Sequence, residues 1–186
     1  MKIDFWLLDI NAEVKAGVPQ LWLWGIDSAG NRVLVIDCRF IDYFYAVVSS
    51  GFDASKLAES IRREHGESIV KLEVTSRRLF GSNVQVLKVY CDDLERVAKL
   101  LRSFEGVKDC LEDDIRMSMR YLIDNNVVPC SWHTVEAREE KNIYKVRVDK
   151  VYLAEFPPHL VNKPEAVAPS LRILSFSMIS YSRGGS

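Results

Sequence analysis

Paired carboxylates are the residues of this chain best suited to chemistry, because two adjacent acids can hold a divalent metal ion or share a proton. They occur as Asp92-Asp93 and Asp113-Asp114. Each pair stands just before a predicted helix, where an acidic side chain caps free backbone N–H groups and is favoured by the helix dipole. We therefore interpret both pairs as helix caps rather than as a metal site.

Other signatures of catalysis are missing from the sequence. It contains no phosphate-binding glycine loop, no G-x-S-x-G elbow and no G-x-G-x-x-G fingerprint. The histidines show no metal-like spacing, and the cysteines include no C-x-x-C pair, so we read each cysteine as a small core residue. The sequence thus predicts no catalytic residue, no metal and no cofactor; the four cysteines are Cys38, Cys91, Cys110 and Cys130.

Two basic spots could bind nucleic acid. Arg77 and Arg78 precede Phe80 in an expected loop over residues 76–83, a combination that suits phosphate contact and base stacking. Arg116 and Arg120 stand four apart on a predicted helix and could face phosphate together. The alternatives are a solvated loop with Phe80 tucked into the core, and an ordinary charged helix surface.

Composition narrows the classes of function. The chain has 186 residues, with 25 basic and 26 acidic side chains and a net charge of −1. A protein that holds nucleic acid by bulk charge has a basic excess, so any contact here must come from a local patch. No apolar run reaches membrane-spanning length and no signal peptide opens the chain, so we expect a cytoplasmic protein without a membrane partner.

Periodicity predicts an α+β fold. Three strands at 5–10, 20–25 and 32–37 open the chain, with a hairpin turn at 27–31. A β-α-β-β-α-β order follows, which is the ferredoxin-like arrangement. Its expected elements are a strand at 43–48, a helix capped by Asp53, strands at 68–75 and 84–91, a helix begun by Asp92, and a strand at 107–111.

The last third is expected to hold less regular structure. A helix at 113–124 is followed by a β-hairpin of segments 131–137 and 143–156. Residues 156–169 contain four of the six prolines and resemble a linker. A final apolar strand is expected at 171–176, whose exposed edge could dock a partner protein.

Several segments, in order, resemble the N-terminal domain of archaeal family B DNA polymerases. Residues 5–10 are similar to that family's opening strand, and residues 40–46 to its aromatic F-x-P-Y-x-Y-A segment. The most specific match is the acidic-Ile turn at 112–115 followed by R-Y-L-I-D at 120–124. The long insert before residue 170 is similar to the insert found in the crenarchaeal branch of that family. The resemblance covers essentially the whole chain.

The resemblance implies that the strand at 171–176 begins an RNase H-like exonuclease sheet, where the family carries the metal-binding residues D-I-E. Here Ser177 stands for the aspartate and Ile179 for the glutamate. A hydroxyl and an alkyl group cannot replace two anionic oxygen ligands. We therefore expect neither nuclease nor polymerase activity, and a chain that ends before the rest of both domains.

The resemblance also implies a pocket for a template base, one that senses uracil in the family. Carried over by position, it would involve Tyr43, Leu94, Ile115, Met117 and Arg120. Two departures argue against uracil sensing. A family aromatic is replaced by Ala12, and the proline before Tyr43 is Asp42, an acid beside a pocket for DNA.

Together these features predict a non-catalytic, template-reading part of a family B DNA polymerase that binds single-stranded DNA in replication or repair. The expected division is a template-reading domain at 1–130, a hairpin and linker at 131–170, and an exonuclease strand at 171–186. A decayed gene, a split subunit and an expressed fragment all fit, with the remaining polymerase domains as possible partners. Two other classes stay open: a module that docks on a replication factor, and a ferredoxin-like RNA-binding protein.

Overall fold

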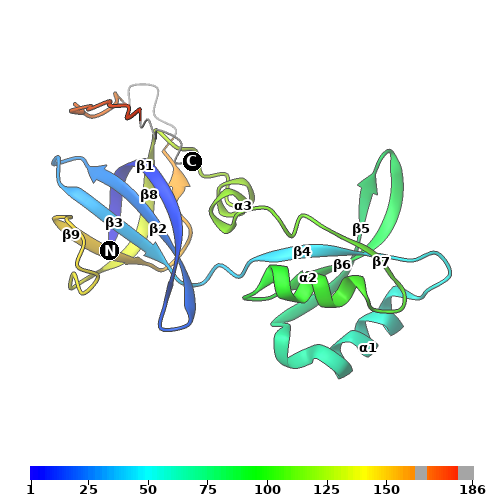
Figure 1. Cartoon of the computed structure of the whole chain (residues 1–186). Helices are drawn as coiled ribbons and strands as arrows, with labels where there is room; N and C mark the ends of the chain where they lie inside the picture. Colours follow the sequence, from blue (N-terminus) through cyan, green and yellow to red (C-terminus); the bar gives the residue numbers. More distant parts are fainter. Residues whose placement is uncertain (162–166, 180–186) are drawn as a thin grey trace, which may run out of the picture.

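The computed structural model describes residues 1–161 and 167–179. In these ranges the chain forms two units, a β-barrel and a four-stranded sheet with two helices, and Figure 1 shows β4 leading from one unit into the other. No helix of the described ranges is long and apolar enough to cross a membrane. The strands of the barrel are β1 (Lys2–Lys15), β2 (Val18–Asp27), β3 (Arg32–Asp37), β8 (Ser131–Glu140), β9 (Lys150–Ala154) and β10 (His159–Leu160).

The barrel closes because its first strand pairs on both sides. β1 pairs antiparallel with β2 along most of its length, and its residues 2–7 also pair antiparallel with 131–136 of β8. β3 lies parallel to β9, which is antiparallel to β8, so the ring runs β1-β2-β3-β9-β8-β1. The predicted hairpin at 20–37 is confirmed. The one expected over 131–156 is formed by the antiparallel strands β8 and β9, with a shorter second strand than predicted, and both hairpins belong to one sheet.

The barrel interior unites residues from both ends of the sequence. Phe5 and Leu23 from the early strands pack with Val135 and Tyr152 from the late ones, and α3 (Met117–Asp124) adds Tyr121. Tyr121 is fully buried and its hydroxyl donates to Asp37 Oδ2 at 3.0 Å. The expected boundary at residue 130 therefore passes through one core, although the functional division into a template-reading part stays a prediction.

The second unit follows the predicted β-α-β-β-α-β order. Its sheet has the order β5-β6-β4-β7, with β4 and β6 in the centre. Phe44 and Leu87 point toward the helices, which bury one face of the sheet. The elements are β4 (Tyr43–Val48), α1 (Ala54–His65), a 3-10 turn η1 (Gly66–Ser68), β5 (Lys71–Leu79), β6 (Ser82–Tyr90), α2 (Leu94–Arg102) and β7 (Val107–Leu111).

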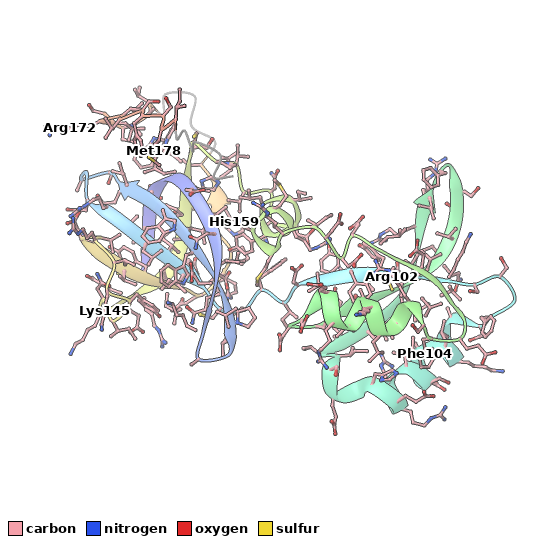
Figure 2. The ribbon with its side chains drawn as sticks, in the orientation of Figure 1. Arg102, Phe104, Lys145, His159, Arg172 and Met178 are labelled. Carbon is pink, nitrogen blue, oxygen red and sulfur yellow. The ribbon has the colours of Figure 1, made fainter. Side chains whose placement is uncertain are left out.

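The acidic cap is confirmed as predicted for α1, lies one residue later than the expected Asp92 for α2, and is wrong for the third helix. Asp53 accepts from Lys56 N, and Asp93 accepts from Arg96 N. α3, however, begins at Met117, and its preceding residue makes no side-chain cap. Asp113 instead accepts from Arg102 of α2 at 2.8 Å, an arginine labelled in Figure 2. An ion pair across the unit has replaced the cap.

Two expected strands of the last third are not formed as predicted. Only Lys150–Ala154 of segment 143–156 is strand; Tyr144, Val146 and Val148 lie in irregular chain packed against the outside of the barrel. Segment 171–176 pairs with no described strand, and Figure 2 shows Arg172 and Met178 in this extended chain. The backbone there lacks a hydrogen-bonding neighbour, so no sheet begins. The exonuclease portion was expected over 171–186, and residues 180–186 of it lie outside the described ranges.

The cysteine interpretation holds for two residues of the four. Cys91 and Cys110 are buried in the core of the second unit, and burial raises the pKa of each thiol to about 12. Cys38 is half-buried, whereas Cys130 is exposed. Reading every cysteine as a core residue was therefore wrong for Cys130.

Candidate nucleic-acid interface

A small pocket lies where the barrel meets the second unit, and we call it the junction pocket. Its volume is about 240 Å³, below the roughly 300–1,000 Å³ of sites for drug-sized ligands, so it suits a group about as large as one base. The turn between β1 and β2, the chain between β3 and β4, and the starts of α2 and α3 supply its walls. It is lined by Ala12, Glu13, Val14, Val18, Pro19, Cys38, Phe40, Ile41, Asp42, Cys91, Asp92, Leu94 and Met117.

Two of the five residues predicted for a template-base pocket line it. Leu94 and Met117 contribute apolar walls. Tyr43, Ile115 and Arg120 are not among the lining residues. Wall residues such as Phe40 and Pro19 were missed. They are 20 or more residues apart in the sequence, and local residue spacing does not show that such residues are neighbours in space.

Arg120 holds the junction together from inside. It is only 3% exposed, and its Nε lies 3.0 Å from Asp42 Oδ1. Its Nη1 donates to Glu112 Oε2 at 3.0 Å and its Nη2 to the Glu112 carbonyl at 2.7 Å. The guanidinium carbon lies 4.2 Å from the centre of the Tyr43 ring. Arg120 is therefore a buried cation whose guanidinium is engaged within the protein, which argues against the predicted contact with DNA phosphate.

Asp42 is explained by the same contacts. Burial raises the pKa of this carboxyl, while the backbone N–H of Tyr43 and the Arg120 guanidinium favour its ionised form. The acid that looked unfavourable beside a DNA pocket thus has its charge paired within the protein. It also fixes the turn into β4, since Tyr43 N donates to Asp42 Oδ1 at 2.9 Å.

The arginines at 77 and 78 lie on a β-hairpin rather than in a loop. β5 and β6 pair as far as Leu79 and Ser82, and only Phe80 and Gly81 form the turn. Figure 1 shows this hairpin projecting from the second unit. Phe80 is fully exposed at its tip, so the alternative that it packs in the core is wrong.

The predicted basic residues do not form one patch. Arg77 packs on Tyr45, with its guanidinium carbon 5.1 Å from the ring centre and Nη2 donating to the hydroxyl at 3.1 Å. Arg78 is exposed beside it on the hairpin. Arg116 is exposed before α3, at the barrel, and Arg120 is internal. Three exposed arginines therefore remain as candidates for phosphate, on two separate surfaces.

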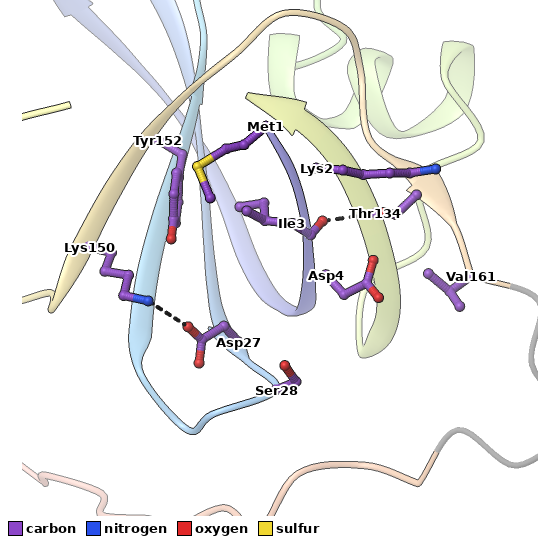
Figure 3. A pocket seen from close by; sticks show the side chains of 10 residues that line it. All are labelled: Met1, Lys2, Ile3, Asp4, Asp27, Ser28, Thr134, Lys150, Tyr152 and Val161. Atoms are coloured by element: carbon purple, nitrogen blue, oxygen red, sulfur yellow. Dashed lines mark hydrogen bonds and ion pairs between the residues drawn. The ribbon is translucent and has the colours of Figure 1, made fainter. Parts of the chain in front are cut away.

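A larger pocket at the barrel wall fits nucleic acid less well. Its volume is about 680 Å³, and Figure 3 shows its side chains around β1 and the turn after β2. Lys150 Nζ lies 3.5 Å from Asp27 Oδ2, so its charge is already neutralised. Lys2 is likewise matched by Asp4 among the lining residues. Apart from the N-terminal ammonium of Met1, which donates to the Ala137 carbonyl, the lining cations and acids are equal in number.

No cluster suited to a metal ion exists in the part of the chain that the structure describes. No three histidine, cysteine or acidic side chains there gather as possible ligands. Ser177 and Ile179, at the positions where the resembling family has its two acids, lie in the exposed extended segment. Their side chains do not fit a divalent metal.

Comparison with known proteins shows which family this chain resembles. Residues 108–186 match the family model described as DNA polymerase family B, exonuclease domain. This match and the relatives below confirm the resemblance to archaeal family B DNA polymerases. The chain is related to them over nearly its whole length.

The individual relatives come from archaea. "DNA polymerase 2" of Aeropyrum pernix is 31% identical over 97% of this chain, and "DNA polymerase 3" of Saccharolobus shibatae is 30% identical over 98%. The family B DNA polymerase structure from Pyrobaculum calidifontis covers 91% of this chain at 35% identity, with a TM-score of 0.73. This chain spans 23% of the length of each of the two sequence relatives and 21% of the solved chain.

Proposed function

We propose that this chain binds single-stranded template DNA as a non-catalytic part of a family B DNA polymerase. The junction pocket carries the proposal, since it is a recess about the size of one base where the two units meet, with apolar walls from Phe40, Leu94 and Met117 and acidic groups from Glu13, Asp42 and Asp92. In this proposal Leu94 and Met117 contact the base, and Arg116 contacts phosphate beside it. The exposed Arg77, Arg78 and Phe80 add contacts from the hairpin.

Two further features support a role with single strands. The closed five-stranded barrel resembles the oligonucleotide-binding barrels, an analogy at the level of the fold alone. The relatives are named as DNA polymerases, and this role would place the chain in the cytoplasm, with the other polymerase domains as partners. With a net charge of −1, few phosphates can be neutralised, so we expect a dissociation constant on the order of 10⁻⁵ M at physiological salt.

Filling the junction pocket tests the proposal. Met117→Trp is expected to weaken binding of a labelled single-stranded oligonucleotide about tenfold, because stacking contributes about 1–3 kcal/mol per base and the indole would occupy the base's place. Fluorescence anisotropy at two salt concentrations gives both affinity and salt slope.

Met119→Trp is the matched control, since Met119 lies on the same helix and is 54% exposed. Its affinity should equal that of the unchanged protein, and circular dichroism should show both variants folded. Equal affinities for the two variants, with both folded, would contradict a base in the junction pocket.

The non-catalytic part of the proposal has its own test. Because Ser177 and Ile179 cannot replace two carboxylate ligands, we expect no Mg²⁺- or Mn²⁺-dependent shortening of a single-stranded 3′ end. A labelled oligonucleotide resolved on a denaturing gel measures this. Shortening that follows the protein through gel filtration and stops on chelation would disprove the expectation.

A second candidate function is docking on another protein. Five apolar side chains of the extended segment 173–179 are 84–95% exposed, far more than a solvated surface normally presents together. Such a segment could add a strand to a partner's sheet, either of the other polymerase domains or of a replication factor. Loss of partner binding in Phe176→Asp, with unchanged DNA binding, would favour this function; the five residues are Ile173, Leu174, Phe176, Met178 and Ile179.

A further inference from the structure

A second recess lies on the other side of the chain that lines the junction pocket, and we call it the tyrosine groove. Its volume is about 480 Å³. Phe40 and Ile41 line both recesses, so the two are separated only by this stretch of chain. The tyrosine groove is lined by Arg39, Phe40, Ile41, Tyr43, Val70, Lys71, Lys88, Tyr90 and Asp124.

Strand register brings the groove's aromatic and basic residues together. Tyr90 of β6 pairs with Tyr43 of β4 on one side and with Lys71 of β5 on the other. Lys88 lies two residues before Tyr90 and therefore on the same face. The helices α1 and α2 cover the opposite face, through Phe44 and its neighbours. The groove thus occupies the sheet face that these helices leave uncovered.

The cations of the groove differ in how far they are neutralised. Lys71 pairs with Glu73 at 2.5 Å, and Arg39 pairs with the buried Asp37 at 3.1 Å. Lys88 forms no ion pair within the described residues. Its ammonium lies 3.6 Å from the centre of the Tyr43 ring and 4.9 Å from that of Tyr90. A cation held by ring faces alone remains able to bind an anion.

The groove's acidic residue is already engaged. Asp124 accepts from the Tyr43 hydroxyl at 3.0 Å. Of the three lining cations, Lys71 and Arg39 are paired with Glu73 and Asp37, so Lys88 is the cation left beside the two tyrosine rings. Aromatic rings on the central strands of a four-stranded sheet are also how RNA-recognition sheets stack bases of a single strand. Stacking on an aromatic ring is itself tolerant of base sequence.

We infer that the tyrosine groove binds the part of a single-stranded DNA next to the base in the junction pocket. Phosphate lies against Lys88 and Arg39, and a base stacks on Tyr90. This inference rests on the proposed function, because the continuity through Phe40 and Ile41 favours one strand passing both recesses over a separate small ligand. When the DNA binds, Lys88 exchanges its contacts to the Tyr43 and Tyr90 rings for a contact to phosphate.

Charge removal in the groove is the first test. Lys88→Gln is expected to weaken binding of an oligonucleotide of about twelve nucleotides roughly fivefold and to reduce the log–log salt slope by about 0.7, since one phosphate contact is lost. Lys99→Gln makes the same charge change at an exposed position of α2, and it should change neither quantity. Equal effects of the two variants would overturn the inference.

Stacking in the groove is tested through Tyr90. Tyr90→Leu is expected to weaken binding of the same oligonucleotide about fivefold, while Tyr90→Phe keeps the ring and should restore most of the affinity. Circular dichroism identifies any variant that fails to fold. If Tyr90→Leu does not fold, the affinity of Tyr90→Phe still tests stacking, because that variant keeps the ring. A Tyr90→Phe loss as large as that of Tyr90→Leu would contradict stacking, since only the hydroxyl contact to Glu73 is then removed.

Oligonucleotide length and type separate the two recesses. An oligonucleotide of about four nucleotides, near the lower limit of single-strand sites, should respond to Met117→Trp and less to Lys88→Gln. With the oligonucleotide of about twelve nucleotides, a loss only with Lys88→Gln supports the tyrosine groove and overturns the junction pocket. With the same oligonucleotide, a loss only with Met117→Trp overturns the tyrosine groove and supports the junction pocket. Tighter binding of duplex DNA, or of RNA with the same sequence, would overturn single-stranded DNA as the ligand of the groove.

Discussion

Replacing Arg120 with methionine is expected to lower the free energy of unfolding by about 3–5 kcal/mol, the usual cost of removing one partner from a buried ion pair. Arg120→Met leaves Asp42 buried without its cation and removes the cation from one face of Tyr43. Glu112 loses two hydrogen bonds but remains half-exposed to water. Urea denaturation at pH 7, followed by circular dichroism, measures the change.

The pH dependence of this loss identifies its cause. Burial already raises the pKa of Asp42, and without Arg120 this pKa should rise further. A carboxyl whose folded pKa lies above its unfolded value binds more protons when folded, so it gains stability as pH falls. The deficit of Arg120→Met should therefore shrink between pH 7 and pH 5. A deficit that is constant over this range would mean that lost packing, rather than an unpaired charge, destabilises the variant.

Arg116→Met is the matched control for Arg120→Met. Arg116 lies four residues earlier but is exposed, so its replacement should change the free energy of unfolding by no more than about 0.5 kcal/mol. Its effect should appear instead in the affinity for single-stranded DNA. A destabilisation equal to that of Arg120→Met would show that the burial of Arg120 is not what matters.

Gly25→Ala is expected to destabilise the barrel by about 1–3 kcal/mol, the range found when atoms are added to a well-packed core. An added Cβ at Gly25 would lie 2.5 Å from the Trp6 carbonyl oxygen and 2.7 Å from Phe5 Cδ2. Phe5 is fully buried, and β1 is held there by both β2 and β8, so neither neighbour can move without disturbing two strand pairings. A thermal unfolding midpoint close to that of the unchanged protein would contradict this close approach.

Gly66→Ala should have the opposite sign. Gly66 has a φ of −56°, and an added Cβ would meet nothing within 4 Å. Alanine fits this conformation and restricts the unfolded chain, so we expect a gain of about 0.4–1 kcal/mol. The thermal unfolding midpoints of the two variants, measured side by side, should therefore move in opposite directions.

The sequence by itself determined most of the local elements and the resemblance to family B DNA polymerases. Apolar side chains alternate every two residues in a strand and recur about every 3.6 residues in a helix, and both patterns depend only on residues nearby in the sequence. The order of strands and helices at 43–111 could therefore be predicted. Asp53 predicted the start of its helix for the same reason, because a cap bonds within three residues. The start expected at Asp92 was one residue too early, since Asp93 is the cap. Motifs such as R-Y-L-I-D at 120–124 indicated the relatives that the comparisons confirm.

Only the tertiary structure decided where charged and aromatic side chains meet. Arg116 and Arg120 looked equivalent by their spacing, but Asp42, 78 positions before Arg120 in the chain, makes the second a buried cation. Residues 2–7 close the barrel against 131–136, and the tyrosine groove gathers side chains from three strands and the chain before them. Contacts between residues so far apart in the sequence are set by packing and burial of the whole chain, so local periodicity does not predict them.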